Sequence, residues 1–179
     1  ISVLCILLSF IPSPANGSPE EFYRIARAAT DTQFIDKIAP PHWYHLMYGM
    51  YLIPKVEELR EANRGVKFME IGLGCWDNFA SVPDKTKKSA HIWNALLSDP
   101  KDEIIVAEYD EPCVKDWQKR GIVPSRIKVL LGDQSDTSVV QRWVKETDGG
   151  HFDIIIDDGG HSNLQIYNSF QVLWPTLND

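Results

Sequence analysis

The sequence contains few cysteines, one short basic cluster ("KTKK" at Lys85–Lys88, expected to be a solvated loop) and no apolar run long enough to cross a membrane. The longest apolar run has eleven residues, at positions 1–11, whereas a helix needs about 20 to span the hydrocarbon core of a bilayer. The chain of 179 residues has 18 Lys and Arg against 25 Asp and Glu, which gives a net charge of −7. Phosphate neutralisation requires clustered basic side chains, so no nucleic-acid partner is expected.

The three cysteines do not predict a disulfide framework or a zinc site. Cys5 lies in the N-terminal apolar run, and neither Cys75 nor Cys113 belongs to a CxxC pair. Zinc sites and disulfide-rich domains both need more cysteines at closer spacing. A single bridge between Cys75 and Cys113 is left open.

The N-terminal segment 1–17 has the pattern of a targeting sequence. Its apolar run has the length of a signal-peptide core, and small residues at Ala15 and Gly17 predict cleavage before Ser18. An uncleaved membrane anchor and a plain hydrophobic helix are the alternatives. We therefore expect the secretory pathway as the location, with membrane contact only through a retained anchor.

Residues 18–64 are expected to form a helical cap or lid region. Ser18 is a typical N-cap residue, with Glu20 and Glu21 in the first turn, where the helix dipole favours acids. A second helical stretch carries many aromatic and histidine side chains, and Pro54 predicts a break within it. This stretch is either an amphipathic helix packed on the core or a lid with substrate-facing residues.

Residues 65–179 alternate strand and helix patterns four times. Alternation of this kind predicts a parallel sheet with helices on both faces, in which ligands bind at the carboxyl ends of the strands. The chain therefore belongs to the α/β class. Acids and glycines follow all four expected strands, at Glu70–Gly74, Glu108–Asp110, Asp133–Asp136 and Asp157–His161.

The motif "EIGLGCWD" has two glycines of a dinucleotide fingerprint but Asp77 in place of the third. Glu70 precedes these glycines, and a carboxylate there would repel a pyrophosphate. Glu108 also follows Gly74 by more than the roughly 20 residues of the NAD arrangement. An NAD-dependent oxidoreductase is therefore disfavoured. A sulfonium nucleoside fits better, with Glu108 accepting from the ribose and Asp133 from the adenine amine.

These motifs resemble those of class I S-adenosylmethionine-dependent methyltransferases. More narrowly, the chain resembles the magnesium-dependent O-methyltransferases of macrolide biosynthesis, from about Thr30 to its end. The resemblance rests on Asp36 with Lys37 and on "HWYHLMYGMYL", "MEIGLG", "GDQSD" and "IIIDDGGHSNLQIYNSFQVLWPTL". It implies a Rossmann-like, three-layer α/β/α fold, with the first four strands present and later strands missing.

The resemblance also implies a role for each candidate residue. Glu70, Gly72, Gly74 and Asp157 would hold the methionine part of S-adenosylmethionine, Glu108 the ribose, and Asp133 with Gln134 the adenine; Asp158 would ligate Mg²⁺, and His161 would be the general base. Departures from the family pattern are Glu108 in place of Asp and Gly160 in place of Ser.

The expected activity is methyl transfer to a hydroxyl of a small molecule or sugar, with Mg²⁺ lowering the pKa of that hydroxyl. The alternative is a non-catalytic module that binds the cofactor or a nucleoside and serves a partner. The fourth strand has no expected neighbour on its far side, so an exposed edge and a poorly stable, aggregation-prone chain are also expected.

Overall fold

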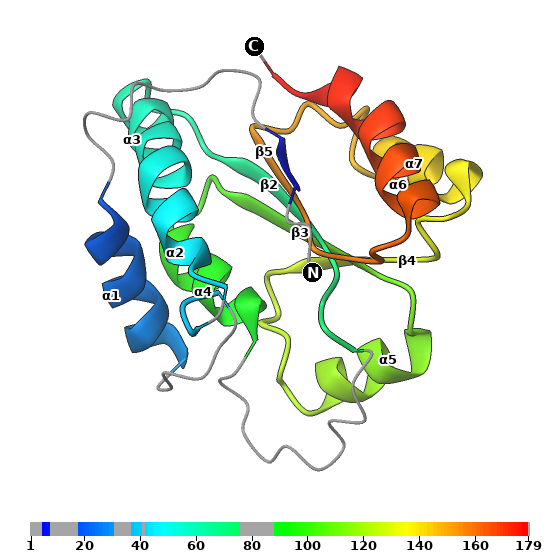
Figure 1. The fold of residues 1–179 in the computed structure, drawn as a ribbon, viewed down its shortest axis with the longest axis horizontal. Coiled ribbons are helices and arrows are strands. Elements are labelled where there is room, and N and C mark those ends of the chain that lie inside the picture. Colours follow the sequence, from blue (N-terminus) through cyan, green and yellow to red (C-terminus); the bar gives the residue numbers. More distant parts are fainter. Residues whose placement is uncertain (1–4, 8–17, 31–36, 41, 76–87, 179) are drawn as a thin grey trace.

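The computed structural model describes residues 5–7, 18–30, 37–40, 42–75 and 88–178. Figure 1 shows a central sheet between two groups of helices. The strands are β1 (Cys5–Leu7), β2 (Lys67–Ile71), β3 (Glu103–Glu108), β4 (Lys128–Leu131) and β5 (Ile154–Asp157). The helices are α1 (Pro19–Thr30), α2 (Tyr44–Met47), η2 (Tyr48–Leu52), α3 (Ile53–Glu61), α4 (Ser89–Leu96), α5 (Glu111–Lys119), α6 (Thr137–Glu146), α7 (Asn163–Leu173) and η4 (Trp174–Thr176).

The sheet has the order β1-β5-β2-β3-β4. Strands β2 to β5 are all parallel, with Phe68 opposite both Ile104 on β3 and Ile154 on β5. The predicted α/β class and its four parallel strands are therefore confirmed.

Side chains of each strand alternate between two apolar layers, as the period of two in a strand requires. On β2, Phe68 packs into the layer beneath α1, α3 and α4, whereas Met69 packs into the layer beneath α6 and α7. Figure 1 shows these helix groups on opposite sides of the sheet. The structure thus has the three layers that the resemblance implies.

The segment 44–61 is one continuous run of helical turns. Residues 48–52 form a π-helical turn, and α3 begins directly after it. Pro54 lies in the first turn of α3, where a helix does not need its N–H. The break predicted at Pro54 is therefore present as the boundary between the π-helical turn and α3, across which the backbone stays helical.

Segment 44–61 packs aromatic residues into the core, as the first of its two predicted roles, an amphipathic helix on the core, requires. Tyr48 is fully buried, and its ring lies 4.8 Å from that of Phe22 and 5.4 Å from that of Trp93. Whether other residues of 18–64 act as a lid stays a prediction.

Strand β1 covers the far edge of β5. It runs antiparallel to β5, with Cys5 opposite Asp157 and Leu7 opposite Ile155, and Figure 1 shows it at that edge of the sheet. The expectation that β5 has no neighbour there is wrong, because the N-terminal apolar run supplies one. Among the described residues, no helix is both long and apolar enough to cross a membrane.

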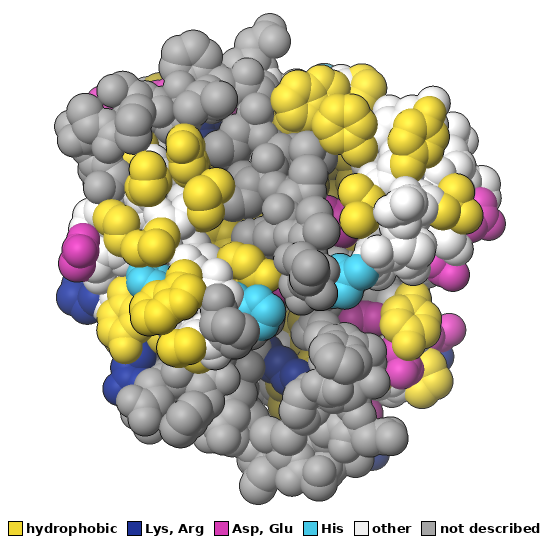
Figure 2. Space-filling view, viewed as in Figure 1, with side chains coloured by type: hydrophobic (Ala, Val, Ile, Leu, Met, Phe, Trp, Pro, Cys, Tyr) yellow, Lys and Arg dark blue, Asp and Glu magenta, His cyan; other side chains and the backbone are white. Residues whose placement is uncertain are grey.

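Helix α7 buries two polar side chains and exposes several apolar ones. Asn168 and Ser169 are buried beneath it, and apolar side chains cover its outer face, as Figure 2 shows. The exposed members are Leu164, Tyr167, Phe170 and Trp174. The inward polar groups are satisfied by the loop after β4, as described below.

Candidate functional site

The strand order reverses between β2 and β5, because the chain runs from β2 through β3 to β4 and then returns to the other side of β2. In open α/β sheets, a crevice for ligands forms at such a point, outside the carboxyl ends of the strands. A cavity of about 370 Å³ lies there. Its lining includes Gly72, Gly74, Glu108, Tyr109, Asp133, Gln134, Asp158, Gly159, Gly160 and His161.

Two glycines shape the cavity wall after β2. Gly72 and Gly74 have φ angles of +97° and +83°, which other residues rarely adopt. A Cβ on Gly72 would also lie 2.3 Å from the carbonyl oxygen of Asp158. Gly72 therefore lets the loop after β2 approach the loop after β5, with no side chain between them.

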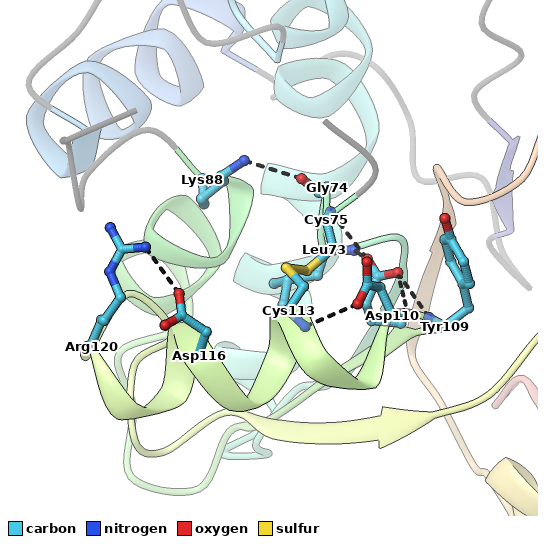
Figure 3. Close-up of a disulfide and its surroundings, with 10 residues drawn as sticks. Leu73, Gly74, Cys75, Lys88, Tyr109, Asp110, Cys113, Asp116 and Arg120 are labelled. Atoms are coloured by element: carbon cyan, nitrogen blue, oxygen red, sulfur yellow. Dashed lines mark hydrogen bonds and ion pairs between the residues drawn. A yellow bond between two sulfur atoms is a disulfide. The ribbon is translucent and has the colours of Figure 1, made fainter. Parts of the chain in front are cut away.

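Glu108 ties the glycine loop to the end of β3. One carboxylate oxygen accepts hydrogen bonds from the N–H groups of Leu73 (3.0 Å) and Cys75 (3.4 Å), and the other from those of Tyr109 (2.8 Å) and Asp110 (3.2 Å). Figure 3 shows these groups converging. A carboxylate has about four acceptor positions. A ribose hydroxyl donating to Glu108 must therefore share or replace one of these bonds, and the bond from Cys75 is the longest.

A disulfide fixes the same loop from the other side. Cys75 and Cys113 are bonded, joining the glycine loop to the first turns of α5 (Figure 3). Asp110 caps α5 by accepting from the N–H of Cys113 at 2.9 Å. The bridge that the sequence left open is therefore present beside the cavity.

Gln134 connects the loops after β4 and β5. Its Nε2 donates to Ser169 Oγ at 2.9 Å and to both Asp157 oxygens at 3.3 Å, and its Oε1 accepts from the N–H of Gly160 at 2.7 Å. Asn168 on α7 donates to the backbone oxygen of Ser135 in the same region. Gln134 is buried and lines the cavity, while its side chain is engaged with protein groups.

Asp133 and Asp157 occupy different surroundings. Asp133 lines the cavity and accepts from the N–H of Ser135 at 2.8 Å. Asp157 is buried, is not among the lining residues and accepts from Gln134 and from the N–H of Gly159. Burial raises the pKa of Asp157, and its hydrogen bonds oppose that rise. Contact between Asp157 and the methionine end of a cofactor stays a prediction.

A lysine compensates the acids at the ends of β2 and β5. The Lys37 ammonium contacts Asp158 Oδ2 and lies 3.7 Å from Glu70 Oε1. Glu70 is fully buried, accepts from Ser89 Oγ at 2.6 Å and does not line the cavity. Burial raises the pKa of Glu70 to about 7, against the opposing effects of Lys37 and Ser89.

The described residues do not by themselves complete a magnesium site. Mg²⁺ prefers six oxygen ligands, but the described part of the chain holds no group of three His, Cys, Asp or Glu side chains placed to bind a metal. Asp158 contacts the positive charge of Lys37, which repels a second cation. Asp158 as a metal ligand stays a prediction.

His161 lies at the cavity edge, directly before α7. It is exposed and lines the cavity. Ser162 caps α7 through a capping box with Gln165, which fixes where the helix begins. His161 therefore lines the cavity from a backbone position that the cap of α7 defines.

Sequence reasoning missed Lys37 and the role of the Gln134 side chain. Lys37 appeared only as part of a motif, because its partner Asp158 lies 121 residues away in the chain. No spacing rule connects residues that far apart. The Gln134 contacts likewise depend on how two loops pack.

The sheet with helices on both faces, the glycine loop after β2 and the acids after β3 and β4 together form a Rossmann-like arrangement, as the sequence resemblance to class I methyltransferases implies. No family model matches the chain. Its sequence is 28% identical over 144 residues to a tetracenomycin-C rhamnosyl 3'-O-methyltransferase of Streptomyces olivaceus, covering 80% of this chain and 32% of that protein. It is also 28% identical to the mycinamicin VI 2''-O-methyltransferase of Micromonospora griseorubida, over 79% of this chain and 30% of that protein.

The predicted resemblance to the macrolide-type O-methyltransferases is therefore confirmed. The chain spans about a third of the length of these curated relatives. An SAH-bound methyltransferase of Podospora anserina matches 90% of this chain and 59% of its own, at 19% identity and a TM-score of 0.40. That likeness is too low to bear on the site.

Proposed function

We propose that the chain carries the cofactor site of an S-adenosylmethionine-dependent O-methyltransferase that acts on a hydroxyl of a small molecule or sugar. The observation that carries this proposal is the cavity at the β2–β5 reversal. Glu108 and Asp133 line it, and none of its described lining residues is Lys or Arg. Such a lining suits a nucleoside without phosphates, and the names of the relatives support methyl transfer to a sugar hydroxyl.

S-adenosylmethionine, when bound, supplies an electrophilic methyl group on a sulfonium. The chain would supply acceptors for the nucleoside at Glu108 and Asp133. His161 would take the proton of the attacking hydroxyl, since histidine has the side-chain pKa nearest neutrality. Its place at the cavity edge lets an acceptor molecule reach it from solvent.

The test combines calorimetry with S-adenosylmethionine and transfer of a labelled methyl group to a panel of sugar hydroxyls. We expect His161→Asn to keep cofactor binding and to lower the transfer rate by about 10²- to 10⁴-fold. His151→Asn is the matched control, because His151 is exposed and does not line the cavity. Equal transfer rates in the two variants would contradict the role of His161.

Magnesium dependence is a finer part of the proposal and rests on the sequence resemblance. Asp158 is its expected ligand. Methyl transfer measured after chelation with EDTA and after adding back Mg²⁺ tests it, with Asp158→Asn as the variant. Transfer that EDTA does not change would remove magnesium from the proposal and leave methyl transfer in place.

A non-catalytic module that binds the cofactor or a nucleoside is the second candidate. The contact between Lys37 and Asp158 favours it, because that contact occupies the one acid predicted to bind a metal. Cofactor binding without methyl transfer to any acceptor, in wild type and His161→Asn alike, would support this candidate.

We further propose that the protein resides in the secretory pathway. The Cys75–Cys113 bridge supports this location, because disulfides persist in oxidising compartments. Cell fractionation with a C-terminal tag tests it, and a wholly cytosolic protein with free thiols would contradict it.

A further inference from the structure

Lys37 is a buried cation at the junction of β2 and β5. Only 3% of its side chain is exposed, and its ammonium lies between the carboxylates of Asp158 and Glu70. Buried ammonium groups are costly unless paired. The position is therefore built to hold one positive charge at this corner of the cavity.

The positions of the strand ends indicate how a nucleoside ligand would lie along the cavity. Glu108 stands at the end of β3 and Asp133 after β4, so the ribose and adenine lie toward β3 and β4 under the proposed function. The remaining part of the cavity faces the ends of β2 and β5. The amino-acid end of the ligand thus lies where Asp158 meets Lys37.

The charges of this corner match a zwitterion. The methionine part of S-adenosylmethionine carries an α-ammonium and an α-carboxylate. The acids lining the described cavity are Glu108, Asp133 and Asp158, so a carboxylate there meets repulsion unless a cation is near. Among the residues that the structure describes, Lys37 is the cation that contacts a lining acid at this corner.

Lys88 is the competing cation. Its ammonium donates to the carbonyl oxygen of Gly74 at 3.2 Å and lies 4.3 Å from the ring centre of Trp117 on α5. These contacts place it on the α5 side of the glycine loop (Figure 3). Lys88 therefore lies toward β3, away from the β2–β5 junction.

We propose that Lys37 binds the α-carboxylate of the cofactor's methionine part. This inference rests on the proposed function and adds a cofactor-binding residue to it. The ligand's α-carboxylate takes the place of Asp158 as the partner of Lys37, which leaves the Asp158 carboxylate to the α-ammonium or to the expected Mg²⁺, so no charge at this corner is left unpaired when the ligand binds. Charge-assisted hydrogen bonds between lysine and carboxylate are among the stronger polar contacts in proteins.

The experiment compares three ligands by calorimetry on the full chain. They are S-adenosylmethionine, its decarboxylated form, which lacks only the carboxylate, and 5'-methylthioadenosine, which lacks the amino-acid part. Wild type should bind S-adenosylmethionine about 10- to 100-fold more tightly than the decarboxylated form. Lys37→Met should lose this preference and bind 5'-methylthioadenosine as wild type does, and Lys37→Arg should keep part of the preference.

Lys55→Met is the matched control. Lys55 is equally buried, and it pairs with Glu58 on α3 at 3.2 Å, so its loss should leave the preference intact. A Lys37→Met variant that binds all three ligands more weakly by the same factor would overturn the inference. The inference would also be overturned if Lys88→Met lost the preference for S-adenosylmethionine over its decarboxylated form and Lys37→Met kept it.

The outcomes separate the inference from the proposed function. Wild type that binds all three ligands equally overturns the role of Lys37 and leaves the cofactor site standing. Wild type that binds none of them overturns both. If Lys37→Met does not fold, the wild-type comparison of the first two ligands together with Lys37→Arg still decides.

Discussion

Glu70 shows how burial and charge act on a single side chain. It has no exposed surface, the Lys37 ammonium lies 3.7 Å from its carboxylate, and its pKa is raised to about 7 from an ordinary 4.5. The native state therefore binds a proton over a pH range in which the unfolded chain has released it. By linkage, the contribution of Glu70 to stability is greatest below about pH 4.5 and declines until about pH 7.

We expect Glu70→Gln to remove this decline. The free energy of unfolding of the variant relative to wild type should rise by roughly 3 kcal/mol at most between pH 4.5 and pH 8. Urea unfolding across that range measures it. Glu57→Gln, at an exposed position, is the control, and a constant difference between Glu70→Gln and wild type would contradict the raised pKa.

The two glycines after β5 differ in what surrounds them. A Cβ on Gly159 would lie 2.1 Å from Gln134 Oε1 and 2.8 Å from Ile71 Cγ2, both buried. A Cβ on Gly160 would meet only the end of the Gln165 side chain. Close approach to a fixed, buried amide therefore explains Gly159, whereas Gly160 adjoins a side chain that can move.

Gly159→Ala should destabilise the protein by about 1–3 kcal/mol, as overpacked interiors do. Gly160→Ala is the comparison and should cost less, because Gln165 can turn away with the loss only of its side-chain bonds to Ser162. Thermal and urea unfolding of both variants measure the difference. Equal losses would mean that the Gln134 side chain moves freely.

For single residues, the sequence predicted which ones line the cavity. It did not predict what most of them contact. Glu108 and Asp133 were predicted from their places at strand ends, and both line the cavity. The contacts of Lys37 and Gln134 depend on loops that approach one another in space. Local sequence patterns do not show which loops meet, so these contacts could not be predicted from the sequence.

Among the elements, the glycine loop after β2 is held both by hydrogen bonds and by a covalent bond. Glu108 holds its backbone through two N–H groups, and the Cys75–Cys113 bond joins it to α5 across 38 residues of chain. Strands and helices of 65–179 were predicted because their apolar periods are regular. The π-helical turn at 48–52 was not, since its sequence has no period distinct from that of an α-helix.

Removing the disulfide should lower the free energy of unfolding by up to about 4 kcal/mol, mainly because the unfolded chain gains freedom. Urea unfolding with and without dithiothreitol measures this loss. The double variant Cys75→Ser/Cys113→Ser should resemble the reduced wild type and be unaffected by the reductant. A wild-type protein that dithiothreitol leaves unchanged would show that the bond does not form in solution.

For the whole molecule, stability depends on what covers the edge of β5. Strand β5 is buried along its full length, and β1 pairs with it along its outer side. The sequence correctly predicted that this edge needs a neighbour, and it failed to identify the N-terminal run as that neighbour. An apolar run of this length is read as a targeting segment, and nothing in its pattern distinguishes that role from a short strand.

Deleting residues 1–17 should lower the unfolding temperature and promote concentration-dependent association, because an open strand edge pairs with other chains. Differential scanning calorimetry and light scattering at several concentrations measure both effects. Replacing Ile6 with Pro, which cannot donate to a sheet ladder, should act in the same direction. A deletion variant that stays monomeric and equally stable would contradict the pairing.

The pairing of β1 with β5 also links maturation to folding. Cleavage before Ser18 would remove Cys5–Leu7 from the same molecule whose sheet those residues complete. A chain cleaved before Ser18 therefore lacks β1, and a chain with β1 paired to β5 is uncleaved; the two are different molecular species. N-terminal sequencing of the natural protein would tell them apart, and in the processed species the vacated edge becomes an acceptor for a strand donated by another polypeptide.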